Sequence, residues 1–169
     1  MKWNACMLVG TLGLLWPLSA AWADFSDNPM IGTRSALSGH ITKIESGVLF
    51  VKTPYGLQPR TISPNKADRV GLHDAHIGDA VWLLVDSGNV LLDAAKPGGE
   101  QFEHHKVVAG RIAYADPFWG EILISTPDGP ERFEIDALAG SKLSVFQEGM
   151  PVTLELDGDN VMIDIQSHR

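Results

Sequence analysis

The strongest constraint in this sequence is an internal repeat. Residues 47–56 read GVLFVKTPYG and residues 120–129 read GEILISTPDG, with Gly, Thr, Pro and Gly at the same offsets and apolar residues at matching places between them. Self-similarity that stays collinear over a long stretch indicates a duplicated structural unit. The fold must therefore be one that a segment of about 60 residues can form, and form twice.

The repeat stays in step through two compensating shifts. Matched residues lie 71 positions apart around Gly39, 73 apart through the stretches quoted above, and 71 apart again from Leu72 onward. The second copy thus has a two-residue insertion in the loop that carries Pro117, Phe118 and Trp119, and a two-residue deletion after it. We divide the chain into an N-terminal segment at 24–35, a first copy at 36–95, a linker at 96–106 and a second copy at 107–169.

Each copy is expected to contain five short strands, because apolar and polar residues alternate in short runs bounded by turn signals. The T-P-x-G sequence favours a hairpin: Pro presets a type I turn and Gly accepts a left-handed backbone. The expected strands are 39–44, 48–53, 58–63, 80–86 and 90–94, then 110–115, 121–126, 131–136, 151–157 and 161–165. This pattern predicts an all-β protein of two tandem five-stranded small barrels, OB or SH3-like.

The fourth strand of the first copy has an unusual outer face. Val81, Leu83 and Val85 form an inner face, yet Trp82 and Leu84 place large apolar groups on the other side. Such groups are expected to be covered by the other copy, by the N-terminal segment or by a partner. Trp82 and Leu84 are therefore candidate partner contacts.

The first 23 residues resemble a secretory signal peptide. Lys2 is followed by a mostly apolar run, and Ala21-Trp22-Ala23 forms a small-x-small cleavage signal. We expect cleavage after Ala23 and a periplasmic or secreted protein with no membrane span. Cys6 is the only cysteine, so the mature chain would lack disulfides and thiolate ligands.

Charge narrows the classes of partner. The chain has 13 Lys and Arg against 21 Asp and Glu, a net charge of −8. An acidic chain without a basic stripe is typical neither of nucleic-acid binding nor of binding to anionic membranes. We therefore expect no nucleic-acid partner, and a protein partner in the cell envelope instead.

The unit pattern resembles the exported bacterial β-barrel repeats whose function is mostly unknown. The residues that carry this resemblance are Gly39-His40-Ile41, Gly47–Thr53 and Gly78-Asp79-Ala80-Val81. A weaker similarity links Ser35–Gly39 and Val70-Gly71-Leu72 to the molybdate-binding Mop/TOBE barrel, which also occurs in tandem. This second resemblance implies oxyanion binding as an alternative function.

Four histidines make metal binding another alternative. His73 and His76 lie three apart in the irregular segment of the first copy, and His104 and His105 are adjacent in the linker. Imidazole with a nearby carboxylate suits zinc or copper. The second copy has other residues where His73 and His76 stand, and adjacent linker histidines are commonly solvated, so both interpretations stay open. No cofactor is implied.

The repeated carboxylates favour structural roles. Asp86 and Asp157 precede tight turns, where such a side chain caps backbone N–H groups, and Asp93 and Asp164 are expected to face outward on their strands. No nucleophile-elbow, zinc-protease, P-loop or dinucleotide motif occurs in the sequence. We therefore expect no catalytic residues and no enzymatic activity.

The differences between the copies indicate where function lies. Phe118 and Trp119 at a hairpin tip either plug the barrel mouth or anchor a partner, because both residues are favoured at interfaces. Tyr55 raises the same question in the first copy, where Asp128 replaces it in the second. We expect a non-catalytic exported binding or scaffold module that docks a protein partner through these aromatics, with Trp82 and Leu84.

Overall fold

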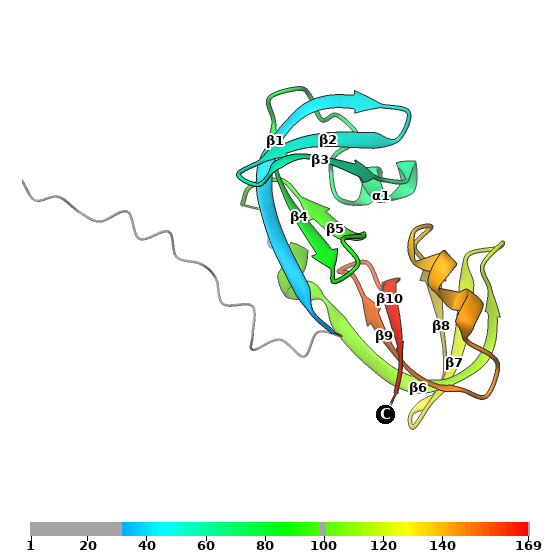
Figure 1. The fold of residues 1–169 in the computed structure, drawn as a ribbon. Coiled ribbons are helices and arrows are strands. Elements are labelled where there is room, and N and C mark those ends of the chain that lie inside the picture. The colour runs from blue at the N-terminus through cyan, green and yellow to red at the C-terminus, as the bar shows by residue number, and fades with distance from the viewer. Residues whose placement is uncertain (1–31, 99–100, 169) are drawn as a thin grey trace, which may run out of the picture.

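The computed structural model describes residues 32–98 and 101–168, which form two similar β-units (Figure 1). The predicted signal peptide lies outside the described residues. The N-terminal unit contains β1 (Arg34–Glu45), β2 (Val48–Thr53), β3 (Gly56–Thr61), the short helix α1 (Pro64–Arg69), β4 (Ala80–Asp86) and β5 (Leu91–Ala95). The predicted all-β architecture of two tandem five-stranded, barrel-like units is confirmed.

A 3₁₀ turn, η2 (Gln101–His104), leads into the C-terminal unit. That unit contains β6 (Lys106–Asp116), β7 (Glu121–Thr126), β8 (Gly129–Ile135), the 3₁₀ segment η3 (Ala139–Val145), β9 (Pro151–Leu156) and β10 (Val161–Ser167). No helix among the residues that the structure describes is long and apolar enough to cross a membrane.

The C-terminal unit is a closed barrel with the strand order β10-β8-β7-β6-β9. Three antiparallel strands are followed by β9, which pairs with β6, and by β10, which pairs with β9. A short parallel pairing between β8 and β10 closes the ring. This five-stranded Greek-key arrangement is OB-like rather than SH3-like.

The N-terminal unit has the equivalent order, β3-β2-β1-β4-β5, but remains an open sheet. A buried arginine marks the difference. Arg60 donates to Asn89 Oδ1 at 2.6 Å and to Gln58 Oε1 at 2.9 Å, so its guanidinium joins the end of β3 to the turn before β5. The residue 73 positions later is Phe133, which packs into the closed barrel's core. The closed barrel thus has an apolar ring where the open sheet has a buried cation held by hydrogen bonds.

The two hairpins that repeat in sequence repeat in geometry. Thr53 Oγ1 donates to the Gly56 carbonyl at 3.0 Å and accepts the N–H of Tyr55. Thr126 makes the same bond to Gly129, at 2.8 Å. Both glycines have positive φ, 117° and 129°, which a side chain would strain. The repeated sequence thus specifies one turn, used twice.

Three apolar clusters make up the core. One fills each unit, and the third joins the units. The joining cluster consists of Leu84, Leu92, Ala95, Phe102 and Ile163. Leu84 is 2% exposed, so the prediction that it contacts a partner is wrong: the other copy covers it. The other copy was one of the three candidates that the sequence analysis gave for covering the outer face of β4.

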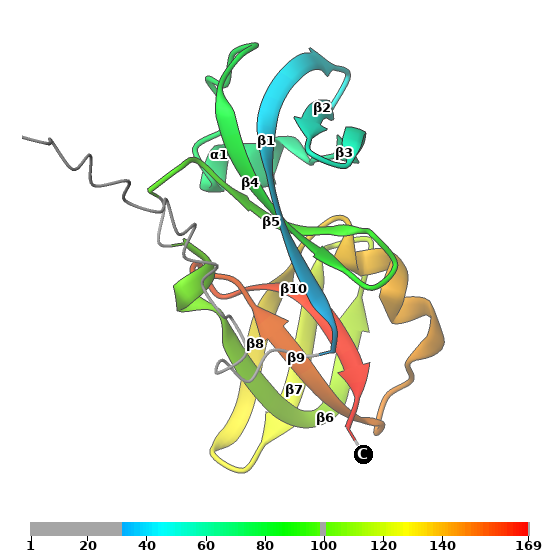
Figure 2. The same ribbon diagram turned by 60° about the vertical axis from the view of Figure 1, so that its left-hand side comes forward.

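Charged side chains also fill the interface between the units, which we call the ionic layer. They come from strands β1, β4, β5, β9 and β10, from α1 and η3, and from the segments beside them. The members are Arg34, Lys66, Arg69, Asp86, Asp93, His105, Asp136, Lys142, Glu155, Asp157 and Asp164. Figure 2 shows the long β1 running from the N-terminal unit down to β9 and β10, where Arg34 pairs with Glu155 and Asp164.

The ionic layer follows the repeat. Arg34 and His105 are 71 positions apart, as are Asp93 and Asp164. Arg34 at the start of β1 reaches Asp164 of the second copy at 2.9 Å, and His105 just before β6 reaches Asp93 of the first copy at 3.0 Å. The units therefore meet through equivalent, reciprocal contacts.

Two sequence predictions are wrong here. Asp93 and Asp164 do not face water: both are buried, because the outer face of their strands is covered by the other unit. His105 is not a solvated linker residue or a metal ligand, since its Nδ1 lies 3.1 Å from Glu155 and its Nε2 lies 3.0 Å from Asp93. Burial alone would lower the pKa of His105, but its two carboxylate partners raise it to about 9.

Candidate functional site

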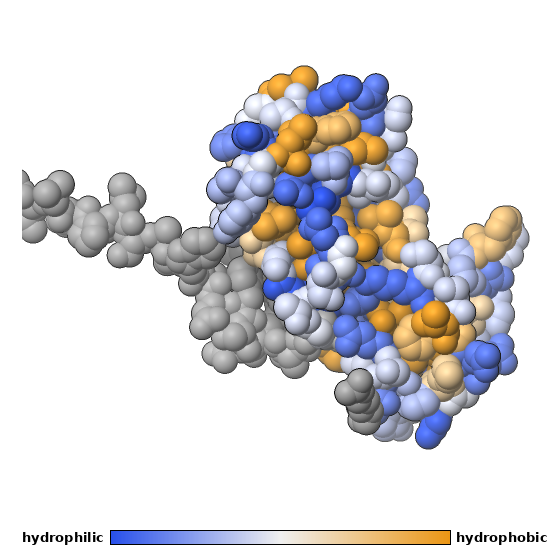
Figure 3. Space-filling view, in the orientation of Figure 1, coloured by the Kyte–Doolittle hydropathy of each residue, from blue (hydrophilic) through white to orange (hydrophobic). Residues whose placement is uncertain are grey.

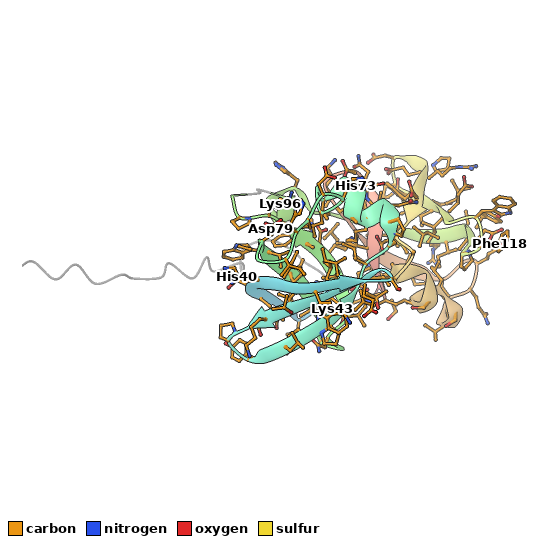
Figure 4. All side chains as sticks on the ribbon, turned by 90° about the horizontal axis from the view of Figure 1, so that it is seen from above. His40, Lys43, His73, Asp79, Lys96 and Phe118 are labelled. Carbon is orange, nitrogen blue, oxygen red and sulfur yellow. The ribbon has the colours of Figure 1, made fainter. Side chains whose placement is uncertain are left out.

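The turn between β6 and β7 carries an ordered pair of exposed aromatics, Phe118 and Trp119, which we call the aromatic tip. Phe118 is 86% exposed and Trp119 is 74% exposed. Their rings meet edge to face with centroids 5.2 Å apart. Of the two sequence hypotheses, a plug over the barrel mouth does not fit this exposure. Figure 4 shows Phe118 at the edge of the molecule, pointing away from the ribbon.

Asp116 holds the aromatic tip in shape. Its Oδ1 accepts the backbone N–H groups of Phe118 and Trp119 at 2.9 and 3.1 Å. Its Oδ2 accepts the hydroxyl of Tyr114 at 3.0 Å. The hydrogen bond from the Trp119 backbone is the main cause that lowers the pKa of Asp116. The turn is thus a fixed platform that presents two rings to solvent.

A cleft of about 620 Å³ lies beside the aromatic tip, between the two units. One wall is formed by Ser63, Pro64, Asn65 and Arg69, which are the N-cap and part of α1. The opposite wall is the end of β8 with Gly140 of η3, and Trp119 stands at the rim. Figure 3 shows the hollow between the units next to the apolar cluster that projects over the β6–β7 turn.

The floor of the cleft is anchored by the ionic layer. Asp136 lines the cleft, and its Oδ2 lies 3.0 Å from Arg69 and 3.4 Å from the buried Lys66. Leu138 N–H donates to the other oxygen of Asp136 at 3.0 Å. The two walls belong to different units, so these ion pairs keep the cleft at a fixed width.

The remaining predicted contacts lie elsewhere. Tyr55 is 76% exposed at the β2–β3 turn, and Trp82 is 41% exposed on β4; neither lines the cleft. The structure does not bring Trp82 or Tyr55 to the aromatic tip. Their roles as partner contacts stay predictions, and neither enters the site described here.

The four histidines do not gather. His73 is exposed and lies 2.8 Å from Asp68, His76 and His104 are exposed, and His105 is buried in the ionic layer. Within residues 32–98 and 101–168, no three His, Cys, Asp or Glu side chains are placed to hold a metal ion. The metal alternative therefore has no site in the described part of the chain.

The arrangement of the repeated aspartates and their neighbouring cations does not support oxyanion binding either. Asp86 and Asp157 cap their turns as expected, each accepting the N–H of the residue four positions later at 2.9 Å. The cations nearest to them are already in ion pairs: Lys142 Nζ lies 2.8 Å from Asp86 Oδ2, and Arg69 Nη2 lies 3.5 Å from Asp157 Oδ2. These cations are neutralised inside the ionic layer rather than presented to a ligand.

Comparison with known proteins gives no family. No protein-family model matches the sequence. No curated protein matches it either. The chain is similar to a solved multidomain protein with nucleic acid binding domains from Streptococcus pneumoniae TIGR4, at 12% identity and a TM-score of 0.27, over 80% of this chain and 51% of that one. It is also similar to Drosophila Unr CSD456, at 13% identity and a TM-score of 0.26, over 80% of this chain and 63% of that one.

The chain thus spans between half and two thirds of the length of these solved chains. One prediction from charge is corrected by the comparison. We expected no nucleic-acid partner, but a solved chain with similar strands is described as carrying nucleic acid binding domains.

Proposed function

We propose that this protein is a non-catalytic, exported binding module that docks a protein partner in the cell envelope. The aromatic tip and the cleft beside it form the docking surface. The observation that carries the proposal is the combination of exposure and order at Phe118 and Trp119.

Exposed aromatics with fixed geometry are suited to binding. Large apolar side chains on a surface cost solubility and need a reason, whereas Trp is among the residues that dominate the energetics of interfaces. Because Asp116 already fixes the turn, little conformational entropy is lost when a partner packs on the rings. A rigid scaffold of two barrels then supports the platform.

The titratable groups support binding rather than catalysis. Perturbed pKa values cluster at active sites when a cleft holds the groups concerned. In the described residues, the buried acid–base sets are His105 with Asp93 and Glu155, and Lys66 with Asp136, and their members pair with one another inside the ionic layer. Of these, Asp136 lines the cleft, where it is also paired with Arg69.

Export rests on the sequence of residues 1–23, which the structure does not describe. If the proposal holds, N-terminal sequencing of protein purified from an envelope extract begins at Asp24.

Replacing Phe118 and Trp119 together with alanine is expected to leave folding intact and to abolish partner capture. Both side chains are largely outside the core, so the thermal midpoint should stay within about 2 °C of wild type. Binding should fall more than about 30-fold, as expected when interface anchors worth about 2 kcal/mol or more are removed. Affinity capture from an envelope extract, with quantitative mass spectrometry, measures the loss.

Tyr55→Ala is the control, since it removes a similarly exposed aromatic from the β2–β3 turn of the other unit, which does not line the cleft. The proposal predicts that Tyr55→Ala retains the proteins that the double variant loses. Retention of the same proteins by all three forms would contradict docking through the aromatic tip. Unfolding of the double variant would show that the rings are part of the core.

Asp116→Ala tests preorganisation separately. This variant keeps both rings but removes the acceptor that orders their backbone N–H groups. We expect capture to weaken by about three- to tenfold, with a faster dissociation rate, because the turn must be ordered on binding. Surface plasmon resonance with the captured partner measures the rates. Unchanged kinetics would mean that the turn keeps its shape without Asp116.

A further inference from the structure

The walls of the cleft contain a pair of carboxylates that oppose each other. Glu121 on β7 is the direct cross-strand neighbour of Glu134 on β8. The adjoining Ile122, Phe133 and Ile135 are buried, so alternation places both glutamates on the outer face. Like charges directly opposite on one face destabilise a sheet. A positive charge placed beside this pair relieves the repulsion.

The cations that line the cleft pair with carboxylates other than Glu134. Arg132 lies 2.7 Å from Glu121, and Arg69 pairs with Asp136 and Asp157. Glu134 makes no ion pair with any residue in the described ranges 32–98 and 101–168, and it is exposed. It lines the cleft together with Trp119. The cleft's uncompensated charge is therefore negative and lies with an aromatic ring at the rim.

Carboxylate and indole together recognise a cation. The face of Trp attracts a Lys ammonium or Arg guanidinium more strongly than the other aromatic rings do. A carboxylate on the other side of the same cation adds a charge-assisted hydrogen bond. The net charge of −8 attracts a basic partner over longer distances.

We propose that the occupant of the cleft is a basic segment of the partner protein, with a Lys or Arg side chain placed between Glu134 and Trp119. This inference rests on the proposed docking function and adds the chemistry of the partner. The aromatic tip supplies packing for the segment, and the acidic pair, Glu121 and Glu134, selects its charge.

The test measures binding of dye-labelled peptides by fluorescence anisotropy. The probes are an octapeptide that alternates Lys and Gly and its counterpart with Glu in place of Lys. Wild-type protein should bind the Lys peptide at least about tenfold more tightly, with affinity that falls as salt is added. Trp119→Ala should weaken binding of the Lys peptide by about fivefold or more.

Glu134→Gln is the decisive variant, and Glu131→Gln on the same strand is its control. Both remove one exposed negative charge, so the change in net charge is identical, but residue 131 does not line the cleft. Glu134→Gln should weaken Lys-peptide binding by about three- to fivefold, and Glu131→Gln by less than about 1.5-fold. Relief of the like-charge pair should leave Glu134→Gln at least as stable as wild type, so misfolding is not a confounding result.

Equal effects of the two variants, or equal binding of the two peptides, would overturn the inference. The docking function can fail separately. If Phe118→Ala with Trp119→Ala loses a captured protein that Glu134→Gln binds with wild-type affinity, docking stands and the basic partner is wrong. If the double variant loses nothing, the docking function itself is wrong.

Discussion

Replacing Glu155 with alanine is expected to lower the free energy of unfolding by about 3–5 kcal/mol, the usual cost of removing one partner from a buried ion pair. Glu155 is fully buried and is shared by Arg34 and His105, which come from equivalent places in the two copies. Its loss leaves two buried cations with fewer acceptors. Urea unfolding followed by circular dichroism measures the change through the shift of the midpoint.

Glu45→Ala is the control for this experiment. Glu45 pairs with Lys43 on the surface, and an exposed pair contributes only about 0–1 kcal/mol. A similar loss in the two variants would mean that the ionic layer adds no more than a surface pair. Calorimetry adds a second readout: if the layer couples the units, wild type unfolds in one transition and Glu155→Ala approaches two.

Stability is also expected to fall between pH 6.5 and about 9, because His105 releases its proton in that range. The folded pKa of His105 lies above its unfolded value, so its contribution is complete below pH 6.5 and is lost as the pH rises through about 9. The shift corresponds to a loss of about 3 kcal/mol. Urea midpoints across this pH range measure the decline.

His105→Gln should remove this dependence, because glutamine does not titrate. The groups that face His105 are the carboxylates Asp93 and Glu155, with Lys66 beside the first and Arg34 beside the second. A variant that retains the same slope between pH 6.5 and about 9 would show that another group causes it.

Acid should destabilise the protein from the other side. Burial raises the pKa values of Asp93 and Glu155, but their hydrogen bonds to His105 and their cationic neighbours outweigh burial and lower both values. A depressed folded pKa contributes stability above the unfolded value, near about 4, and that stability is lost as the pH falls further. The free energy of unfolding is therefore expected to be highest between about pH 4.5 and 6.5.

Rigidity between the units matters for binding because the cleft has one wall from each. Arg69 and Lys66 of α1 hold Asp136, which forms part of the floor below β8. A cleft whose walls are fixed before binding loses less entropy when occupied. Variants that loosen the ionic layer should thus weaken docking without touching the aromatic tip.

The strands could be predicted from the sequence where local patterns specify them. The predicted ranges 48–53 and 121–126 coincide with β2 and β7, since alternation and the T-P-x-G turn specify them. The first strand was expected from residue 39, yet β1 begins at Arg34. Its early part is defined by pairing with β4, from Arg34 opposite Asp86 to Ser38 opposite Trp82, and such a long-range ladder leaves no periodic trace.

Only part of the candidate site could be predicted from the sequence. The insertion marked Phe118 and Trp119 in the sequence, but Glu134 gains its role from lying opposite Glu121, which depends on register. Asp93 was misread because alternation gives the face of a strand and not what covers that face, and His105 was misread because it was assigned to a solvated linker. The recurrence of Asp93 as Asp164 was the available signal, and reciprocal pairing between copies explains it.

Glu155 has one further consequence, which concerns ancestry. Its counterpart 71 positions earlier is Leu84, so the two copies differ where Arg34 and His105 converge. In a homodimer of one ancestral copy, every position occurs twice. Glutamate at this position in both subunits would add a second buried negative charge. Leucine in both would leave both cations without their shared acceptor. Covalent fusion removes that restriction. The duplicated chain can therefore keep an asymmetric junction that identical subunits could not, and its two halves are free to diverge into an open sheet and a closed barrel.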